Sequence, residues 1–138
     1  MSTNIRAELS QKNPYWIERH RYYELKHFCL QYSIWKRALV ILDTDLKAFC
    51  ISEPINNPSV SKPVEELALK RLYFKNRIDM VDRASSEADS SLSNYILEAV
   101  TKGLSYDTLK SLYSIPCCKD TYYNVYRRFF WLLDKARA

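Results

Sequence analysis

The hydrophobic residues of this 138-residue chain recur at intervals of three and four positions along most of its length. That spacing places them on one side of an α-helix, and no stretch alternates convincingly between apolar and polar residues as a half-buried β-strand does. In the stretch YWIERHRYYELKHFCLQY, the residues that share one helical side are Tyr22, Leu25, Cys29 and Tyr32. The pattern predicts an all-α protein, a compact bundle of about six helices.

The predicted organisation is a single domain over residues 1–138, whose N-terminal scaffold occupies residues 1–50. Asn13 and Pro14 indicate the start of its first helix, because asparagine caps helices and proline at the first helical position loses no hydrogen bond. Ser33 is expected to cap the second helix, and the residues expected to face inward there are Trp35, Leu39, Leu42 and Leu46. Residues 51–62 are predicted to form a loop, because this stretch is rich in proline, asparagine and serine.

Residues 63–101 are predicted to form the central helices. Pro63 is expected to open the third helix, with Glu65 and Glu66 in its first turn, where the helix dipole favours negative charge. Its inward residues are expected to be Leu67, Phe74, Ile78 and Val81. Ser90 or Ser91 is expected to cap the next helix, LSNYILEAVTK.

Gly103 is the only glycine of the chain, and it follows the last periodic residues of that helix. A glycine there predicts a left-handed C-cap, and Ser105 two residues later can cap a further helix that carries Asp107 in its first turn. Leu109 and Leu112 are expected to face inward, and Pro116 ends this short helix. A last helix is predicted from about Cys118 to Lys135, so residues 102–138 are expected to contain a helix-turn-helix.

The segment GLSYDTLKSLYSIP resembles the helix-turn-helix of sigma-factor region four, over residues 102–133. The whole chain is also similar to small regulators of the ArpU/RinA kind from prophages of Gram-positive bacteria. Three features depart from the sigma pattern: Lys110 stands where alanine is usual, Ser114 stands where the turn glycine is usual, and the segment CCKD is about two residues longer. The resemblance implies a phage regulator of transcription that acts on RNA polymerase at a promoter.

The last predicted helix separates into an inward and an outward side. Tyr122, Tyr126, Phe129 and Leu133 share the inward side. The candidate DNA-binding residues are those left on the outward side: Lys119, Asp120, Tyr123, Asn124, Arg127 and Arg128. Asparagine can bind adenine and arginine can bind guanine in the major groove, while cations neutralise phosphates.

Charge and composition narrow the function classes. The net charge is +5, and residues 102–138 carry seven Lys and Arg against three Asp and Glu, which favours a polyanion partner for this segment. One glycine cannot supply a nucleotide-binding glycine motif. No apolar run is long enough to span a membrane, and residues 1–4 lack the features of a signal peptide, so a cytoplasmic protein of a bacterial host is expected.

The remaining polar residues predict no enzyme, metal or cofactor. His20 and His27 lie two helical turns apart and cannot share a metal ion without other ligands, and no glycine-flanked serine nucleophile is present. The four cysteines lack zinc-knuckle spacing and are expected to be reduced thiols: Cys29, Cys50, Cys117 and Cys118. No small-molecule substrate is expected.

The leading hypothesis is a DNA-binding transcriptional regulator whose partners are double-stranded DNA, RNA polymerase and a second copy in a homodimer. Two other functions stay open: a small phage protein that inhibits a host factor, as anti-defence proteins do, and a packaging-associated DNA-binding subunit. A buried helical hairpin that only imitates a helix-turn-helix is the structural alternative.

Overall fold

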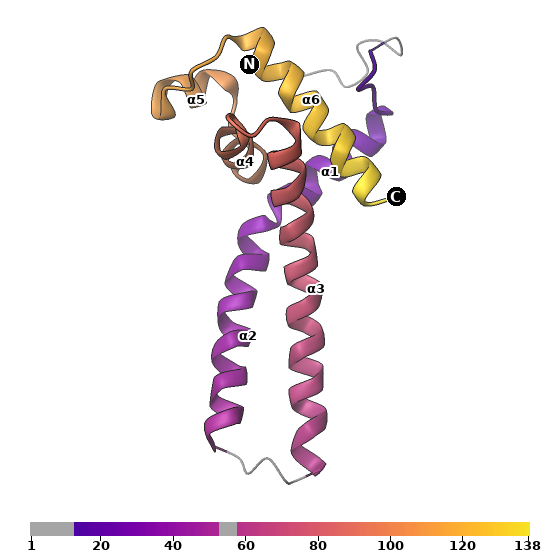
Figure 1. Cartoon of the computed structure of the whole chain (residues 1–138), viewed down its shortest axis with the longest axis vertical. Helices are drawn as coiled ribbons and strands as arrows, with labels where there is room; N and C mark the ends of the chain where they lie inside the picture. The colour runs from indigo at the N-terminus through magenta and orange to yellow at the C-terminus, as the bar shows by residue number, and fades with distance from the viewer. Residues whose placement is uncertain (1–12, 53–57) are drawn as a thin grey trace. The chain divides into compact units, whose positions relative to one another are not determined.

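The computed structural model describes residues 13–52 and 58–138, and within this part all regular secondary structure is α-helical (Figure 1). The elements are α1 (Arg19–Leu30), α2 (Tyr32–Ser52), α3 (Pro58–Ala88), α4 (Ser93–Lys102), α5 (Tyr106–Tyr113) and α6 (Lys119–Ala136). The all-α prediction is confirmed for this part. Only Gln31 separates α1 from α2, so the described helices number five if these two are taken as one interrupted helix. None of the described helices combines the length and hydropathy that crossing a membrane requires.

The chain divides into two compact units, which are described separately. Unit 1 consists of Met1–Gln31 and Met80–Ala138, and unit 2 is Tyr32–Asp79. The predictions of one domain and of a compact bundle therefore stay predictions. The prediction about a signal peptide concerns residues 1–4, which lie outside the described ranges.

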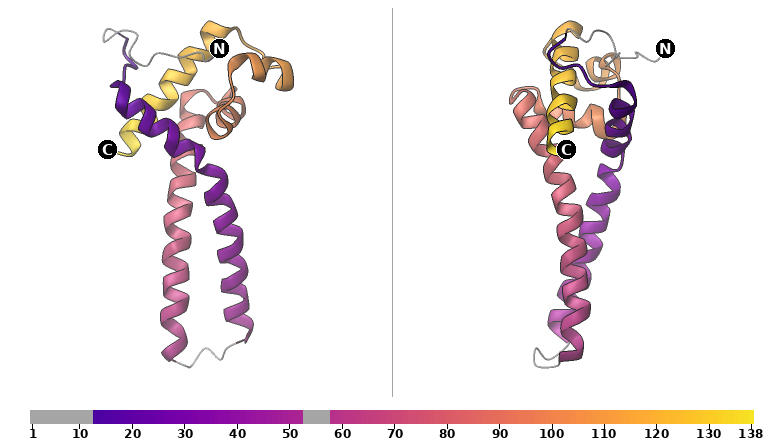
Figure 2. Two further views of the ribbon diagram at one scale, coloured as in Figure 1. Left: turned by 180° about the vertical axis from the view of Figure 1, so that it is seen from behind. Right: turned by 90° about the vertical axis from the view of Figure 1, so that its right-hand side faces the viewer.

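Unit 2 is a pair of helices, α2 and the first part of α3, that run side by side in opposite directions (Figures 1 and 2). Two predicted helix starts in this unit are wrong. Ser33 lies inside α2, which begins one residue earlier, and Pro63 lies inside α3, which begins at Pro58. A second proline at the first helical position explains the earlier start, because its missing N–H is not needed there. The predicted loop is therefore shortened at both ends, and its residues 53–57 lie outside the described part.

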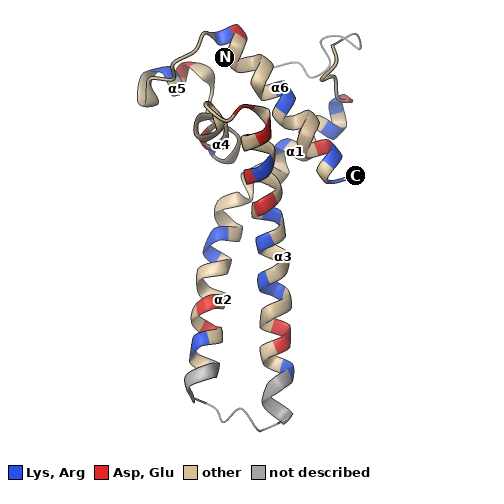
Figure 3. Cartoon of the chain, viewed as in Figure 1, with Lys and Arg blue, Asp and Glu red and all other residues tan. Residues whose placement is uncertain are grey.

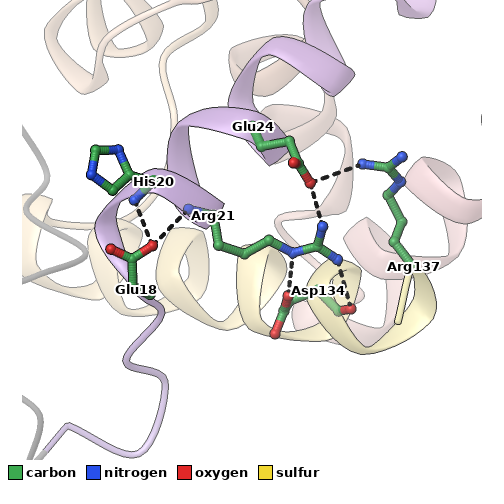
Figure 4. A network of polar contacts seen from close by, with 6 residues as sticks. All are labelled: Glu18, His20, Arg21, Glu24, Asp134 and Arg137. Atoms are coloured by element: carbon green, nitrogen blue, oxygen red, sulfur yellow. Dashed lines mark hydrogen bonds and ion pairs between the residues drawn. The ribbon is translucent and has the colours of Figure 1, made fainter.

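The start of α1 is also corrected by the structure. Asn13 and Pro14 form a turn, in which the Asn13 side chain accepts a hydrogen bond from Tyr15 N at 2.9 Å, and α1 begins only at Arg19. The cap is Glu18, whose carboxylate accepts from the backbone N–H groups of His20 and Arg21 at 2.9 and 3.2 Å (Figure 4). An acidic side chain can replace the usual small capping residue because it satisfies the same free N–H groups.

The expected serine cap of α4 is wrong as well. The structure places Leu92 at the N-cap, and it is Asp89 whose carboxylate accepts from the N–H groups of Ser91 and Leu92 at 2.9 and 3.1 Å. The Ser91 hydroxyl donates to the same carboxylate at 2.6 Å, and this bond is the main cause of a lowered Asp89 pKa. Ser91 thus supports the helix start through Asp89.

The core of unit 1 is formed where α1 packs on α4 and α6, and α4 packs on α5 and α6 (Figure 2). Its innermost side chains are less than 2% exposed: Leu25, Cys29, Val81, Ile96, Leu109, Ile115, Tyr122, Phe129, Phe130 and Leu133. Burial of such side chains is the main favourable term in folding. The three aromatic rings of this set belong to α6, and that of Phe130 packs against the Tyr22 ring of α1.

An ionic network joins the same two helices at the surface (Figure 4). The Arg21 guanidinium of α1 donates to the Asp134 carboxylate of α6 at 2.6 Å and also contacts Glu24. Arg137, at the C-cap of α6, reaches Glu24 at 3.7 Å and lies over the Phe28 ring. Partly exposed pairs of this kind contribute modestly to stability, but a network limits how α1 and α6 can slide.

Gly103 adopts the predicted left-handed conformation, with φ 69° and ψ 36°, at the C-cap of α4. Its neighbour Leu104 donates its N–H to Ala99 O at 2.9 Å, and Ser105 caps α5 by accepting from Thr108 N at 3.2 Å. The predicted corner between these two helices is therefore confirmed.

Replacing Gly103 tests how much of unit 1 depends on that corner. A Cβ built at this position lies 3.5 Å from Leu30 Cδ2, an ordinary contact, so the backbone conformation decides the effect. We expect Gly103→Ala to lower the free energy of unfolding by about 1 kcal/mol, since side chains disfavour positive φ. Gly103→Asn should lose less, because asparagine tolerates this region. Urea unfolding followed by circular dichroism measures both, and equal stability of Gly103→Ala and wild type would contradict the argument.

Candidate nucleic-acid interface

The turn between α5 and α6 is held by three local features. Ser114 is the only non-glycine residue with positive φ in the described part, at φ 52° and ψ 47°. Ile115 follows it and is 1% exposed, and the Tyr106 hydroxyl donates to Cys117 O at 2.6 Å. Serine is uncommon in the left-handed region, so the surrounding contacts must hold this conformation. Ser114 thus has the backbone conformation that a glycine would adopt most easily.

The inward side of α6 is confirmed in full. Tyr122, Tyr126, Phe129 and Leu133 are at most 7% exposed. Val125 and Phe130 are buried too, so the buried side is wider than the predicted stripe. On α5, Leu109 is buried as predicted, but Leu112 is 70% exposed and its inward placement is wrong. A helix of eight residues has room for few inward positions, and here Tyr106 and Leu109 occupy them.

Four of the six candidate DNA-binding residues are exposed on α6: Lys119, Asp120, Asn124 and Arg128. Tyr123 was expected to face outward, but it is only 9% exposed and its ring packs against Tyr106, Tyr122 and Tyr126. Its placement is therefore corrected to the core. The reason is that neighbouring aromatic rings of α6 fill more of the helix circumference than periodicity indicates.

Arg127 is half-buried, between the two sides of α6. Its Nε is buried without a hydrogen-bond partner among the described residues, while its Nη1 donates to Asn124 Oδ1 at 3.4 Å. The side chain therefore runs from the core towards the exposed Asn124 amide. Arg127 can restrict where that amide points, and its side chain is less exposed than that of Arg128.

Exposed cations occur along the whole of α6. In the described part, Lys119, Arg128 and Lys135 have no acidic partner within ion-pair distance, whereas Arg137 at the C-cap pairs with Glu24. Lys110 is exposed on α5, so it does not pack against α6 as alanine would at that position. Asp120 lies in the first turn of α6, where its negative charge interacts favourably with the helix dipole and stabilises the helix. Lys119 therefore supplies unpaired positive charge at the start of α6, as Arg128 and Lys135 do further along the helix.

Cys118 is the N-cap of α6 and is exposed. Its sulfur lies 3.2 Å from the Thr121 hydroxyl, and hydrogen bonds from Thr121 lower its pKa. Burial instead raises the pKa of Cys117, and raises that of Cys29 strongly. From sequence, the same reduced state is predicted for all of these thiols and their pKa values cannot be ranked, because sequence does not show burial. The Cys50 side chain lies outside the described part.

The thiolate is the reactive form of cysteine, so the pKa differences predict an order of alkylation. With iodoacetamide near neutral pH we expect Cys118 to react first, Cys117 later, and Cys29 only when the protein unfolds. Peptide mass spectrometry of quenched samples measures the order. In urea the differences should disappear, and equal rates in the folded protein would contradict the assignment.

A cavity of about 180 Å³ lies behind α6, within unit 1. Side chains of α1, α4 and α6 line it, including Tyr22, Tyr122 and Tyr123. The hydroxyls of Tyr122 and Tyr123 are buried and have no hydrogen-bond partner among the described residues, whereas the Tyr126 hydroxyl lies 2.9 Å from that of Tyr22. Burial is the main cause of the raised Tyr126 pKa. The buried tyrosines of α6 thus differ in how well their hydroxyls are satisfied.

This difference predicts opposite outcomes for two matched substitutions on α6. Tyr126→Phe removes the bond to Tyr22 and should lower the free energy of unfolding by about 1 kcal/mol. Tyr122→Phe removes a hydroxyl that has no hydrogen-bond partner among residues 13–52 and 58–138, so it should be neutral or stabilising. Thermal and urea unfolding measure both. A larger loss for Tyr122→Phe than for Tyr126→Phe would contradict the hydrogen-bond assignment.

The side chains of the described part contain no group of three or more His, Cys, Asp or Glu that could hold a metal ion. His20 and His27 are both exposed on α1. Comparison with protein-family models, curated proteins and solved structures finds no match to this chain. The function must therefore be argued from the site itself.

Proposed function

We propose that this chain binds duplex DNA through α5, the turn and α6, with α6 entering the major groove. The observation that supports this best is the division of α6 into a buried aromatic side and an exposed polar side at its N-terminal half. A helix anchored in this way presents a fixed set of side chains, and helix-turn-helix proteins place the first part of the second helix in the groove.

The exposed residues of α6 from Lys119 to Arg128 have complementary tasks in the proposal. Asn124 would read adenine through its amide, which is the usual asparagine contact in the major groove. Lys119 and Arg128 would neutralise phosphates, and Arg128 could instead bind guanine. Arg127 acts as a positioning residue, because it donates to the Asn124 side chain. Tyr123 supports the helix from inside and has no place in the contact surface.

We further propose that DNA binding serves transcription regulation by a phage or prophage protein, with RNA polymerase as a second partner. This step depends on the resemblance of GLSYDTLKSLYSIP to sigma-factor region four. The left-handed Ser114 is consistent with it, because that residue stands where the resembling proteins usually have the turn glycine.

A second candidate is a protein that inhibits a host factor through a protein interface. The exposed Leu112 and Tyr113 at the end of α5 favour it, since they are 70% and 39% exposed. Apolar residues on a surface are common singly, so two neighbours support this candidate less strongly than the polar side of α6 supports DNA binding.

Two lysines of α6 provide a matched test of DNA binding. Lys119 and Lys135 are both exposed, and each lies near an aromatic ring, that of Tyr123 at 6.0 Å and that of Trp131 at 3.4 Å. They are separated by about 24 Å along the helix. If the N-terminal half binds DNA, Lys119→Ala should reduce the slope of log K against log salt by about 0.9, while Lys135→Ala leaves it unchanged.

Fluorescence anisotropy with a mixed-sequence duplex, titrated at several salt concentrations, measures both slopes. Circular dichroism shows whether each variant keeps the helical fold. Absence of DNA binding by the wild-type chain would refute the proposal, and equal effects of the two alanine variants would refute the position assigned to the interface.

A further inference from the structure

Unit 2 exposes an unusual amount of apolar surface for a pair of helices. Six large side chains are each more than half exposed: Ile34, Val40, Ile41, Leu69, Leu72 and Tyr73. Two packed helices bury only the side chains at their shared interface. Apolar side chains on their other sides stay exposed to water unless a further element covers them. Exposed apolar residues that lie close together on one face are typical of an interaction surface.

Part of this surface forms a groove between α2 and α3. Its volume is about 690 Å³, and its lining residues are Ala38, Ile41, Leu42, Leu69, Lys70, Tyr73 and Phe74. Lys70 is the one charged residue of that lining. Val40, next to Ile41 in sequence and equally apolar, does not belong to it. The groove therefore distinguishes one apolar side of the hairpin from the others.

Charge is distributed unequally along the hairpin (Figure 3). Asp43 of α2 pairs with Arg71 of α3 at 2.7 Å, which marks the level where the two helices can be divided. We call residues 32–42 with 72–79 the basic half, because it holds four Lys and Arg against one Asp. We call residues 44–48 with 62–70 the balanced half, because it holds three Asp and Glu against three Lys.

We propose that a second copy of this chain covers the groove, with the two hairpins antiparallel across a two-fold axis. In this arrangement the basic half of each copy faces the balanced half of the other, whereas parallel docking would place the two basic halves together. Ile41, Leu69 and Tyr73 lie near the middle of the hairpin, where both copies would share them around the axis. The product is a four-helix bundle, which buries sides that one hairpin leaves open.

The geometry names a specific pair of charges. Glu66 and Arg77 flank the groove residues Leu69 and Tyr73 at helical spacings of three and four, so all four share one side of α3. Arg77 also lies over the Tyr73 ring at 3.4 Å. Antiparallel docking brings Glu66 of each copy towards Arg77 of the other. The proposal concerns unit 2 and does not require DNA binding.

Sedimentation equilibrium of the full chain tests the dimer, with a matched pair of substitutions on α2. The wild type should have twice the 16.4 kDa mass of one chain. Ile41→Glu should raise the dimer dissociation constant at least about a hundredfold, because each copy would bury a carboxylate. Val40→Glu should leave the dimer intact. Val40 and Ile41 are 67% and 61% exposed, so neither change should disturb the fold, and circular dichroism checks this.

Two charge reversals test the antiparallel orientation. Glu66→Arg alone and Arg77→Glu alone should each raise the dissociation constant about tenfold, because each homodimer then contains two like-charged pairs. An equal mixture of the two variants should form a heterodimer of wild-type affinity, since both pairs are then again of opposite charge. In a parallel dimer the wild type and both variants would each contain two like-charged pairs, so neither charge reversal alone would weaken association, and the mixture would bind more tightly than the wild type.

Three results would overturn the proposal. The first is a monomeric wild type at all concentrations that stay in solution, which would leave the groove for a different protein. The second is a dimer that Ile41→Glu does not weaken, or that Val40→Glu weakens equally. The third is a charge reversal that alone does not weaken the dimer, or a mixture of charge-reversed chains that associates no better than either variant alone.

Discussion

The packing of the α6 aromatic side against α1 and α4 is the constraint on which unit 1 depends. Tyr122, Tyr126, Phe129 and Phe130 are almost fully withdrawn from solvent, and the Tyr126 hydroxyl meets that of Tyr22 in α1. Because this side must stay buried, rotation of α6 about its axis is fixed. The exposed residues of the opposite side follow from that rotation, so the proposed DNA-contacting surface is a consequence of core packing.

Two left-handed residues then determine where the helices before α6 end. Gly103 ends α4 without a side-chain penalty, and Ser114 ends α5 in a conformation that serine adopts less readily. The buried Ile115 and the bond from Tyr106 to Cys117 O support the second turn. At Gly103 the residue type suits the left-handed backbone. At Ser114 it does not, so packing around this residue must offset the cost of the left-handed conformation.

Periodicity in the sequence was sufficient to predict the helical class and four of the inward residues of α6, Tyr122, Tyr126, Phe129 and Leu133. The corner at Gly103 could be predicted from local residue types. A glycine at a C-cap and a serine at the next N-cap act on the adjacent backbone and need no distant partner. The boundaries that failed depended on competing local choices. Pro58 stands before Pro63 at the first helical position, and Glu18 and Asp89 act as caps in place of Asn13 and of the serines. A single sequence does not show which of several capable residues will cap.

The candidate site was predicted less completely, for tertiary reasons. Tyr123 has a polar hydroxyl that suits the surface, but neighbouring rings bury it. Leu112 is apolar, yet its side chain is exposed because Tyr106 and Leu109 occupy the inward positions of α5. The half-buried Arg127 depends likewise on what packs beside α6. The ionic network of Arg21, Asp134 and Arg137 joins residues more than a hundred positions apart, and no local pattern indicates such pairs.

Unit 1 is built from two segments of the sequence, Met1–Gln31 and Met80–Ala138, and the sequence of unit 2 separates them along the chain. During synthesis α1 is made well before α6, so its tyrosine and phenylalanine rings meet their native neighbours on α6 only after residues 119–136 have left the ribosome. Contacts between such distant segments slow folding, since a long loop must close first. A fragment containing only α4, α5 and α6 would also lack the side chains of α1 that cover the buried sides of α4 and α6. We therefore do not expect this fragment to fold as an independent module in another protein.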